Sequence, residues 1–305
     1  MMSGNRSNVR KHILLTIDVE DWFQVENFKS YIPFSSWPSC ESRVEHNTHR
    51  LLDLLDATEG LPGSAGPIRA TFFVLGWLAN RIPHLVREIS RRGHEVASHG
   101  YNHDLCTHLP FDALRKDLAD SKQELENIVG KAVNGYRAPS FSVNGDVLTI
   151  LAECGYSYDS SYNSFRGNSR YGRLDLVRNG NGIASKLSPG LYELPISNLR
   201  LGNRVIPTGG GGYFRLIPAP LFNRAARYIL NMEKAFLFYM HPWEIDPEQP
   251  KVKQAPAVSR FRHYVNLNKT LPRLKNLVWE LSGCRFVSCH DYLMQVCSIG
   301  SNSAA

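Results

Sequence analysis

Acidic side chains that could bind a cation follow the first apolar run of this 305-residue sequence. The run ends in Asp18, Glu20 and Asp21. Residues i and i+2 of a strand share a face, so Asp18 and Glu20 should point the same way. Two neighbouring carboxylates repel one another unless a cation or a proton lies between them. The motif therefore indicates a cation site, although a solvated strand end or a helix N-cap would also accommodate it.

A second motif contains two histidines, His99 and His103, within Ser-His-Gly-Tyr-Asn-His. Histidines four residues apart can present both imidazoles to one ion if the segment forms a turn. An acid and two imidazoles suit Zn²⁺ or another divalent first-row metal. Alone, the pair fits a pair of exposed loop histidines equally well.

Two further motifs place a polar residue at the end of a predicted strand and a proline close behind it. Arg137 precedes Ala138 and Pro139, and an arginine there can hold a carboxylate through two hydrogen bonds. His241 precedes Pro242, and its imidazole suits a general acid because its pKa lies near neutrality. A surface Arg-Pro turn and a buried core histidine are the alternatives.

A run of four glycines, 209–212, precedes Tyr213 and Phe214. Glycine runs can cradle phosphates, but the Lys-Ser/Thr pair of a phosphate-binding loop and the spacing of a dinucleotide-binding loop are both missing. We therefore predict a flexible loop that lets substrate approach closely.

Short β-rich runs alternate with helical patterns along most of the chain, which predicts a parallel sheet or barrel. Catalytic groups of α/β barrels gather at the carboxyl ends of the strands, where four of these five motifs lie. The predicted strands are 12–18, 70–75, 94–98, 132–137, 156–159, 235–240 and 285–287. The predicted helices are 48–58, 77–92, 111–129, 146–154, 218–233, 271–281 and 290–296. Long loops around short strands are expected over 163–212, and an exposed loop over 246–257.

The bulk composition, 43% hydrophobic and 21% charged, is that of a globular protein. The formal charge of +7 favours an anionic partner such as an acidic polysaccharide or a membrane surface. No nucleic-acid-binding motif is present. No segment approaches the roughly 20 apolar residues of a spanning helix, and the first apolar run is too short for a signal peptide. We predict a cytoplasmic protein.

Taken in order, the motifs resemble the polysaccharide deacetylase (NodB-homology) family. The matching segments are 16–21, 99–103, 137–140 and 240–241, and the resemblance covers roughly residues 10–245. Within the family, the Asp-Val-Glu-Asp-Trp-Phe run, the Gly-Gly-Gly-Tyr-Phe-Arg loop and His-Pro-Trp-Glu look like a bacterial subgroup associated with exopolysaccharide gene clusters and exosortase systems.

The resemblance implies an α/β fold, a distorted (β/α) barrel with fewer than eight complete units. It assigns 10–245 to the catalytic domain and 246–297 to a C-terminal extension packed on the barrel. The remaining residues, 298–305, are expected to form a frayed tail.

The resemblance also implies a divalent metal, Zn²⁺ or similar, held by Glu20, His99 and His103. Most family members have two adjacent aspartates in the first motif, the first a base and the second a metal ligand. Here Val19 occupies the second position, so Asp21 rivals Glu20 as the acidic ligand.

The implied activity is metal-dependent removal of N-acetyl groups from an amino-sugar polysaccharide or its precursor. Asp18, oriented by Arg137, would act as the base, and His241 would protonate the departing amine. A backbone N–H near Tyr101 would help to stabilise the tetrahedral oxyanion.

The expected partner is an N-acetylated amino-sugar chain or a lipid-linked glycan precursor. The predicted substrate contacts are Trp22, Tyr101, Pro139, Tyr213 and Trp243, although core packing explains the aromatic residues equally well. Two alternatives remain open: hydrolysis of cyclic or small amides on the same barrel, and a non-catalytic carbohydrate-binding scaffold.

Overall fold

A curled, mostly parallel sheet forms the centre of the computed structural model, which describes residues 11–57, 66–176 and 182–301. Nine strands of the described chain join in the order β10-β1-β2-β3-β4-β5-β7-β6, with β11 beside the start of β1. Only the β6–β7 pair is antiparallel. The strands are β1 (His12–Val19), β2 (Thr71–Val74), β3 (Glu95–Ser98), β4 (Gly135–Tyr136), β5 (Tyr158–Asp159), β6 (Ser185–Ser188), β7 (Leu191–Glu193), β10 (Ala235–Met240) and β11 (Arg285–Phe286).

The described chain that follows β7 has no regular strand pairing with β10, the strand at the other end of the sheet, but contacts it at two points. After β7, the amide of Ser197 donates to the carbonyl oxygen of Leu237 in β10 at 3.3 Å. Further along, the amide of Tyr239 donates to the carbonyl oxygen of Gly209 at 2.8 Å. A separate hairpin of β8 (Leu199–Leu201) and β9 (Arg204–Ile206) lies between these contacts in the sequence. The predicted fold, a distorted barrel with fewer than eight complete units, is confirmed.

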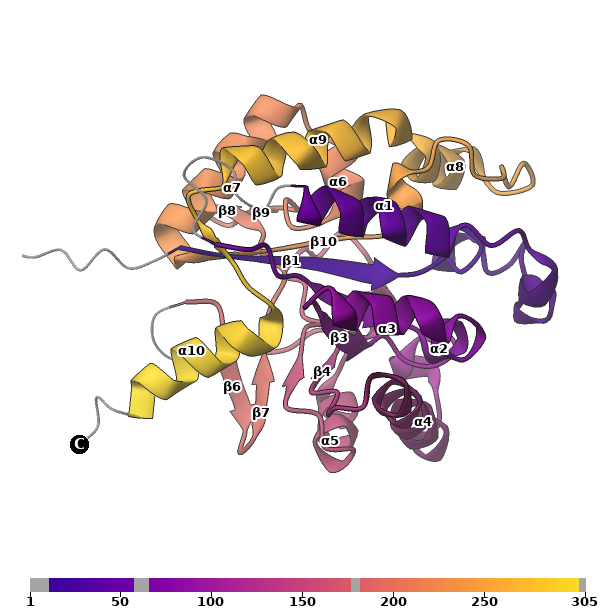
Figure 1. Cartoon of the computed structure of the whole chain (residues 1–305), viewed down its shortest axis with the longest axis horizontal. Coiled ribbons are helices and arrows are strands. Elements are labelled where there is room, and N and C mark those ends of the chain that lie inside the picture. The colour runs from indigo at the N-terminus through magenta and orange to yellow at the C-terminus, as the bar shows by residue number, and fades with distance from the viewer. Residues whose placement is uncertain (1–10, 58–65, 177–181, 302–305) are drawn as a thin grey trace, which may run out of the picture.

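Helices cover the outer face of the sheet (Figure 1). They are α1 (Val44–Asp56), α2 (Gly76–Arg81), α3 (Pro83–Arg91), α4 (Phe111–Val129), α5 (Gly145–Glu153), α7 (Ala219–Glu233) and α9 (Leu267–Glu280). The helix predicted over 77–92 is in fact two, because proline lacks an amide hydrogen and restricts the residue before it, here Ile82. The strand predicted over 132–137 is confined to β4.

Side chains of β1 alternate between two apolar layers, as the period of a strand requires. Ile13, Leu15 and Ile17 pack in the large core under the helices, whereas Leu14 packs in the barrel interior. Asp18 shares the face of Leu14. The polar end of the strand is therefore directed into the barrel.

The C-terminal part of the chain completes the barrel rather than forming a separate lobe. It contributes β11 to the sheet, and α10 (Cys289–Ser301) closes the amino-terminal end (Figure 1). There the amide of Cys289 donates to Oγ1 of Thr71 at 2.8 Å, and that of His290 to Oε2 of Glu95 at 3.1 Å. Residues 298–301, predicted to be frayed, continue α10, while 302–305 lie outside the described residues.

Short helices line the opposite, carboxyl-terminal end of the strands. They are the 3-10 helices η1 (Glu26–Phe28), η2 (Phe34–Ser39), η3 (Cys106–His108), η4 (Pro139–Phe141) and η5 (Pro242–Ile245), with α6 (Gly211–Leu216) and α8 (Ala257–Tyr264). With one end closed by α10, the predicted catalytic residues gather at this open end. No helix of the described chain is both long and apolar enough to span a membrane.

Candidate active site

A buried cluster of one carboxylate and two imidazoles lies beyond β1 and β3. Oε1 of Glu20 lies 2.9 Å from Nε2 of His99 and 3.0 Å from Nε2 of His103. One ligand atom from each of the three residues lies within 4.8 Å of the other two. The structure thus brings the three predicted metal ligands together.

The donor set of this cluster fits a divalent cation such as zinc. Nδ1 of His99 donates to the carbonyl oxygen of Arg137 at 2.7 Å, which directs Nε2 toward Glu20. His103 has a φ of 58°, a left-handed conformation that is rare outside glycine and typical of functional sites. Two imidazoles and one carboxylate are a ligand set of catalytic zinc sites.

Asp21, the rival ligand, points away from this cluster. Its carboxylate accepts from the amides of Arg43 at 2.7 Å and Val44 at 3.0 Å, and from Oγ of Ser42 at 2.9 Å. These groups lie at the start of α1, so Asp21 caps that helix from a distant part of the sequence. The geometry therefore favours Glu20 as the acidic ligand.

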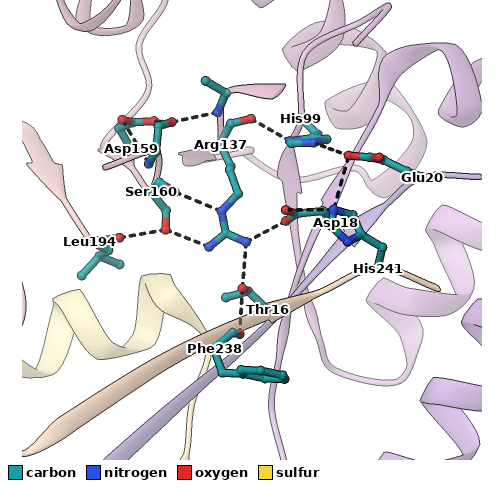
Figure 2. A network of polar contacts seen from close by, with 12 residues as sticks. Thr16, Asp18, Glu20, His99, Arg137, Asp159, Ser160, Leu194, Phe238 and His241 are labelled. Atoms are coloured by element: carbon teal, nitrogen blue, oxygen red, sulfur yellow. Dashed lines mark hydrogen bonds and ion pairs between the residues drawn. The ribbon is translucent and has the colours of Figure 1, made fainter. Parts of the chain in front are cut away.

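Asp18 forms a buried ion pair with Arg137 beside the cluster (Figure 2). Oδ1 of Asp18 lies 2.6 Å from Nη1 of Arg137. Oδ2 lies 3.9 Å from Nε2 of His241. Burying two charges is costly unless they are paired and hydrogen-bonded, and this pair meets both conditions. The carboxylate is thereby fixed between the arginine and the histidine.

The guanidinium of Arg137 is held by two residues that the sequence analysis missed. Ser160 accepts from Nε through its carbonyl oxygen at 3.0 Å and from Nη2 through Oγ at 2.9 Å. Thr16 accepts from Nη1 at 2.8 Å and donates to the carbonyl oxygen of Phe238 at 3.0 Å. The guanidinium also lies 4.1 Å from the ring centroid of Phe73, a cation–π contact. Figure 2 shows how these bonds fix its orientation.

A second buried ion pair orients His241, which follows β10. Nδ1 of His241 donates to Oε1 of Glu244 at 2.8 Å, and Nε of Arg215 donates to Oε2 at 2.7 Å. Nε2 of His241 is left facing Glu20 at 3.7 Å and Asp18 at 3.9 Å. The bond to Glu244 thus fixes which imidazole nitrogen faces the site.

Burial and neighbouring charges shift the pKa values of Glu20 and His241 in opposite directions. Burial raises the pKa of Glu20, but the imidazoles of His103 and His241 outweigh it and hold this pKa well below its usual range. Burial lowers the pKa of His241, but Glu20, Glu244 and Asp18 together raise it to about 9. A cation bound at Glu20 would offset part of that increase. His241 is thus placed to carry a proton near neutral pH.

The cluster opens into a cleft of about 560 Å³. Its lining includes Asp18, Glu20, His99, His103 and His241. Two of the predicted substrate contacts, Tyr213 and Trp243, also line it. Predicted metal ligands, base, acid and two aromatic residues therefore face one space.

The other three predicted substrate contacts, Trp22, Tyr101 and Pro139, do not line this cleft. Trp22 packs edge-on against Phe23, and its Nε1 donates to the carbonyl oxygen of Glu41 at 2.9 Å. Pro139 begins η4. An aromatic or proline residue near a catalytic motif can serve packing or turn formation equally well. Here Trp22 serves packing and Pro139 forms the turn that begins η4.

Tyr101 also supports the fold instead of facing substrate. Its ring lies close against Gly76, where a Cβ atom would overlap it. Its amide donates to Oδ2 of Asp117 at 3.0 Å, and that of Asn102 to Oδ1 at 3.4 Å. Because the Tyr101 amide is already engaged, our prediction of an oxyanion contact there needs correction.

The glycine run is packed closely at 209–211 and enters α6, which corrects our prediction of a flexible loop, whereas Gly212 does line the cleft. A Cβ atom at Gly210 would overlap the ring of Tyr239, and one at Gly211 would overlap the carboxylate of Glu244. At Gly212 a Cβ atom would meet nothing within 4 Å. The glycines let the start of α6 lie against β10 and against the residue that orients His241.

Gly211→Ala is therefore expected to lower kcat by about 100-fold, because small displacements of catalytic groups have effects of that size. The added methyl group would displace Glu244 and with it His241. Gly145→Ala is the matched control, because Gly145 also lies at the start of a helix, an added Cβ there meets nothing within 4 Å, and the residue does not line the cleft. Steady-state kinetics and thermal unfolding of both variants test this. Equal kcat values in the two would contradict the packing argument.

Comparison with known proteins gives two family matches in tandem. A polysaccharide deacetylase model matches residues 8–158, and a model of a domain of unknown function (DUF3473) matches residues 160–294. The first match contains Asp18, Glu20, His99, His103 and Arg137. The chain belongs to the polysaccharide deacetylase family. His241 and Glu244 lie in the second match, so this deacetylase-family site draws on both segments.

Curated relatives of this polysaccharide deacetylase family member match over short stretches. A peptidoglycan-N-acetylglucosamine deacetylase of Bacillus cereus is 32% identical over 87 residues, 28% of this chain and 40% of that protein. Peptidoglycan deacetylase-like protein FGM2 of Gibberella zeae is 34% identical over 113 residues, 37% of this chain and 31% of that protein. The chain thus spans less than half the length of these relatives.

Solved structures share the fold over nearly the whole chain. One, described as a polysaccharide deacetylase from Mycobacterium smegmatis, has a TM-score of 0.60 at 20% identity, covering 96% of this chain and 93% of that one. Puue allantoinase has a TM-score of 0.59 at 12% identity, covering 93% and 90%. At these identities the likeness establishes the deacetylase-type barrel and nothing further.

Proposed function

We propose that this protein is a metal-dependent hydrolase that removes N-acetyl groups from an amino-sugar polysaccharide or its precursor. The observation that carries the proposal is the arrangement of three groups around one cleft. The Glu20–His99–His103 cluster lies beside His241, which is paired with Glu244, and His241 in turn lies beside Asp18, which is paired with Arg137. Metal-assisted amide hydrolysis uses a cation site, a base and an acid together, and this cleft offers residues suited to all three.

The reaction adds water to the acetamide carbonyl carbon and then breaks the bond from that carbon to nitrogen. Glu20, His99 and His103 would hold the cation, which lowers the pKa of water and polarises a carbonyl group when bound. Asp18 accepts the proton of the attacking water, and Arg137 holds its carboxylate in place.

His241 supplies the other proton. Its Nδ1–H is bonded to Glu244, so Nε2 carries the proton toward the departing nitrogen. Without that proton the amine would be a very poor leaving group. The products are acetic acid, which ionises to acetate, and a free amino sugar. The cycle is complete when Asp18 has released its proton to solvent and His241 has taken one up.

We further propose zinc as the metal, exopolysaccharide biosynthesis as the setting and a cytoplasmic location. Support for zinc comes from the two imidazoles in the cluster. Support for the setting comes from the resemblance of the Gly-Gly-Gly-Tyr-Phe-Arg and His-Pro-Trp-Glu segments to the exopolysaccharide-associated subgroup. A lipid-linked glycan precursor is the substrate that such a location would provide.

Metal content by mass spectrometry, measured beside acetate release from N-acetylglucosamine oligomers, tests the proposal. We expect about one divalent ion per chain in the wild type, with both metal and acetate release lost in His99→Ala. The control is His84→Ala, since His84 lies exposed on α3 and pairs with Glu45. Bound metal without acetate release would indicate another amide substrate. Absence of both under metal-replete conditions would favour a carbohydrate-binding scaffold.

A further inference from the structure

The cleft extends beyond the cation cluster along two walls that meet at an aromatic contact. One wall is segment 165–171, and the other is formed by α6 and α8. The rings of Phe165 and Tyr213, one from each wall, pack edge to face with centroids 5.7 Å apart. Aromatic side chains of this kind provide apolar surface for a sugar ring. This part of the cleft, defined by Phe165, Arg170, Tyr213 and Arg262, is called the outer subsite below.

Three of the four carboxylates that line the cleft have a close positive partner or a predicted role at the cation site. Asp18 is paired with Arg137, Glu244 with Arg215, and Glu20 with His99 and His103. The fourth, Glu26, lies 3.9 Å from Lys29, whose closer partner is Asp104 at 2.9 Å.

Two arginines of the outer subsite have no such counterpart. Nη2 of Arg170 donates to Oδ1 of Asn27 at 2.9 Å, and Nε donates to Oδ1 of Asn168 at 3.4 Å. These neutral amides fix the direction of the side chain and leave its charge uncompensated. Arg262 lies exposed on α8 and lines the same cleft as Tyr213. Among the residues that the structure describes, no carboxylate pairs with either guanidinium.

We propose that the outer subsite binds an oxyanion of the substrate, located beside the N-acetylated sugar. Guanidinium groups bind carboxylate and phosphate through paired hydrogen bonds, and two of them around an aromatic surface suit an anionic sugar unit. The oxyanion would be the carboxylate of an acidic sugar or a phosphate of a sugar–lipid linkage. This inference rests on the proposed function for the position of the acetylated sugar, and it defines the substrate class as anionic.

Equilibrium binding to the metal-loaded Asp18→Asn protein, which lacks the proposed base and so consumes the probes far more slowly, tests this apart from turnover. Isothermal titration calorimetry would compare three probes at one fixed ionic strength. They are a tetrasaccharide of alternating N-acetylglucosamine and glucuronic acid, neutral chitotetraose, and N-acetylglucosamine joined to farnesol by diphosphate. We expect an anionic probe to bind about 10- to 100-fold more tightly than chitotetraose, the range for hydrogen bonds to charged groups. Preference for the acidic tetrasaccharide or for the diphosphate identifies the source of the oxyanion.

In the same background, Arg170→Gln and Arg262→Gln are each expected to reduce that preference by about 3- to 10-fold. Arg87→Gln is the matched control, because it removes the same charge from an exposed position on α3 outside the cleft. Equal affinity for anionic and neutral probes would overturn the inference, as would an equal effect of Arg87→Gln. Acetate release, measured in parallel on the protein with Asp18 intact, distinguishes failure of one proposal from failure of the other. Binding preference without release would contradict deacetylation alone, and release without preference would contradict the outer subsite alone.

Discussion

Asp18→Asn is expected to slow acetate release by about 100- to 10,000-fold, the range that a positioned general base contributes. Asparagine keeps an oxygen that can accept from Nη1 of Arg137 but cannot take a proton from water. Bound metal should remain, because Glu20, His99 and His103 are unchanged. The measurement is kcat with a neutral N-acetylglucosamine oligomer, with metal content determined on the same samples.

Thr16→Val is the control that distinguishes loss of the base from loss of a hydrogen bond to Arg137. Oγ1 of Thr16 accepts from the same Nη1 of Arg137 but does not line the cleft. The variant should lose about 1–3 kcal/mol of stability, the cost of an unsatisfied buried donor, and keep kcat within about 10-fold. If Thr16→Val and Asp18→Asn reduced kcat equally, Asp18 would be a structural residue and not the base.

Arg137→Met is expected to destabilise the protein by about 3–5 kcal/mol, because it leaves the buried carboxylate of Asp18 without its partner. The corresponding fall in Tm is roughly 6–20 °C. Adding Asp18→Leu should restore at least half of the lost stability, since a buried ion pair can be replaced by apolar groups at little cost. Guanidinium unfolding of the two single variants and the double variant tests this. No recovery in the double variant would mean that Ser160 and Thr16, rather than the charge of Asp18, dominate the stability of this region.

The parts of the site that depend on strand geometry follow from the sequence. Alternation along β1 places Asp18 on the interior face, and the prolines after Arg137 and His241 mark where their strands end. The position of His99 and His103 after β3 follows in the same way. Local periodicity and turn chemistry determine these features, so one sequence without relatives suffices to predict them.

The residues that hold these groups in place could not be predicted, because their partners lie far away in the sequence. Ser160 reaches Arg137 only through the pairing of β4 with β5, and Arg215 reaches Glu244 only because glycines allow α6 to pack closely. Of these residues, Glu244 would have been the easiest to predict from the sequence, because it stands three residues after His241 in the same motif. Residue type alone also failed for Trp22 and Asp21, whose chemistry suits both a ligand site and the packing or capping role that they have.

The pairing of β1 with β10 has a consequence for synthesis of the protein. Thr16 and the β10 residue that it contacts, Phe238, are 222 residues apart. At translation rates of about 5–20 residues per second, β1 leaves the ribosome roughly 10–45 s before its partner strand exists. During that time one edge of a very apolar strand has no neighbour, a state that favours aggregation. The yield of folded protein should therefore depend more on chaperone supply and growth temperature than on the stability of the finished barrel.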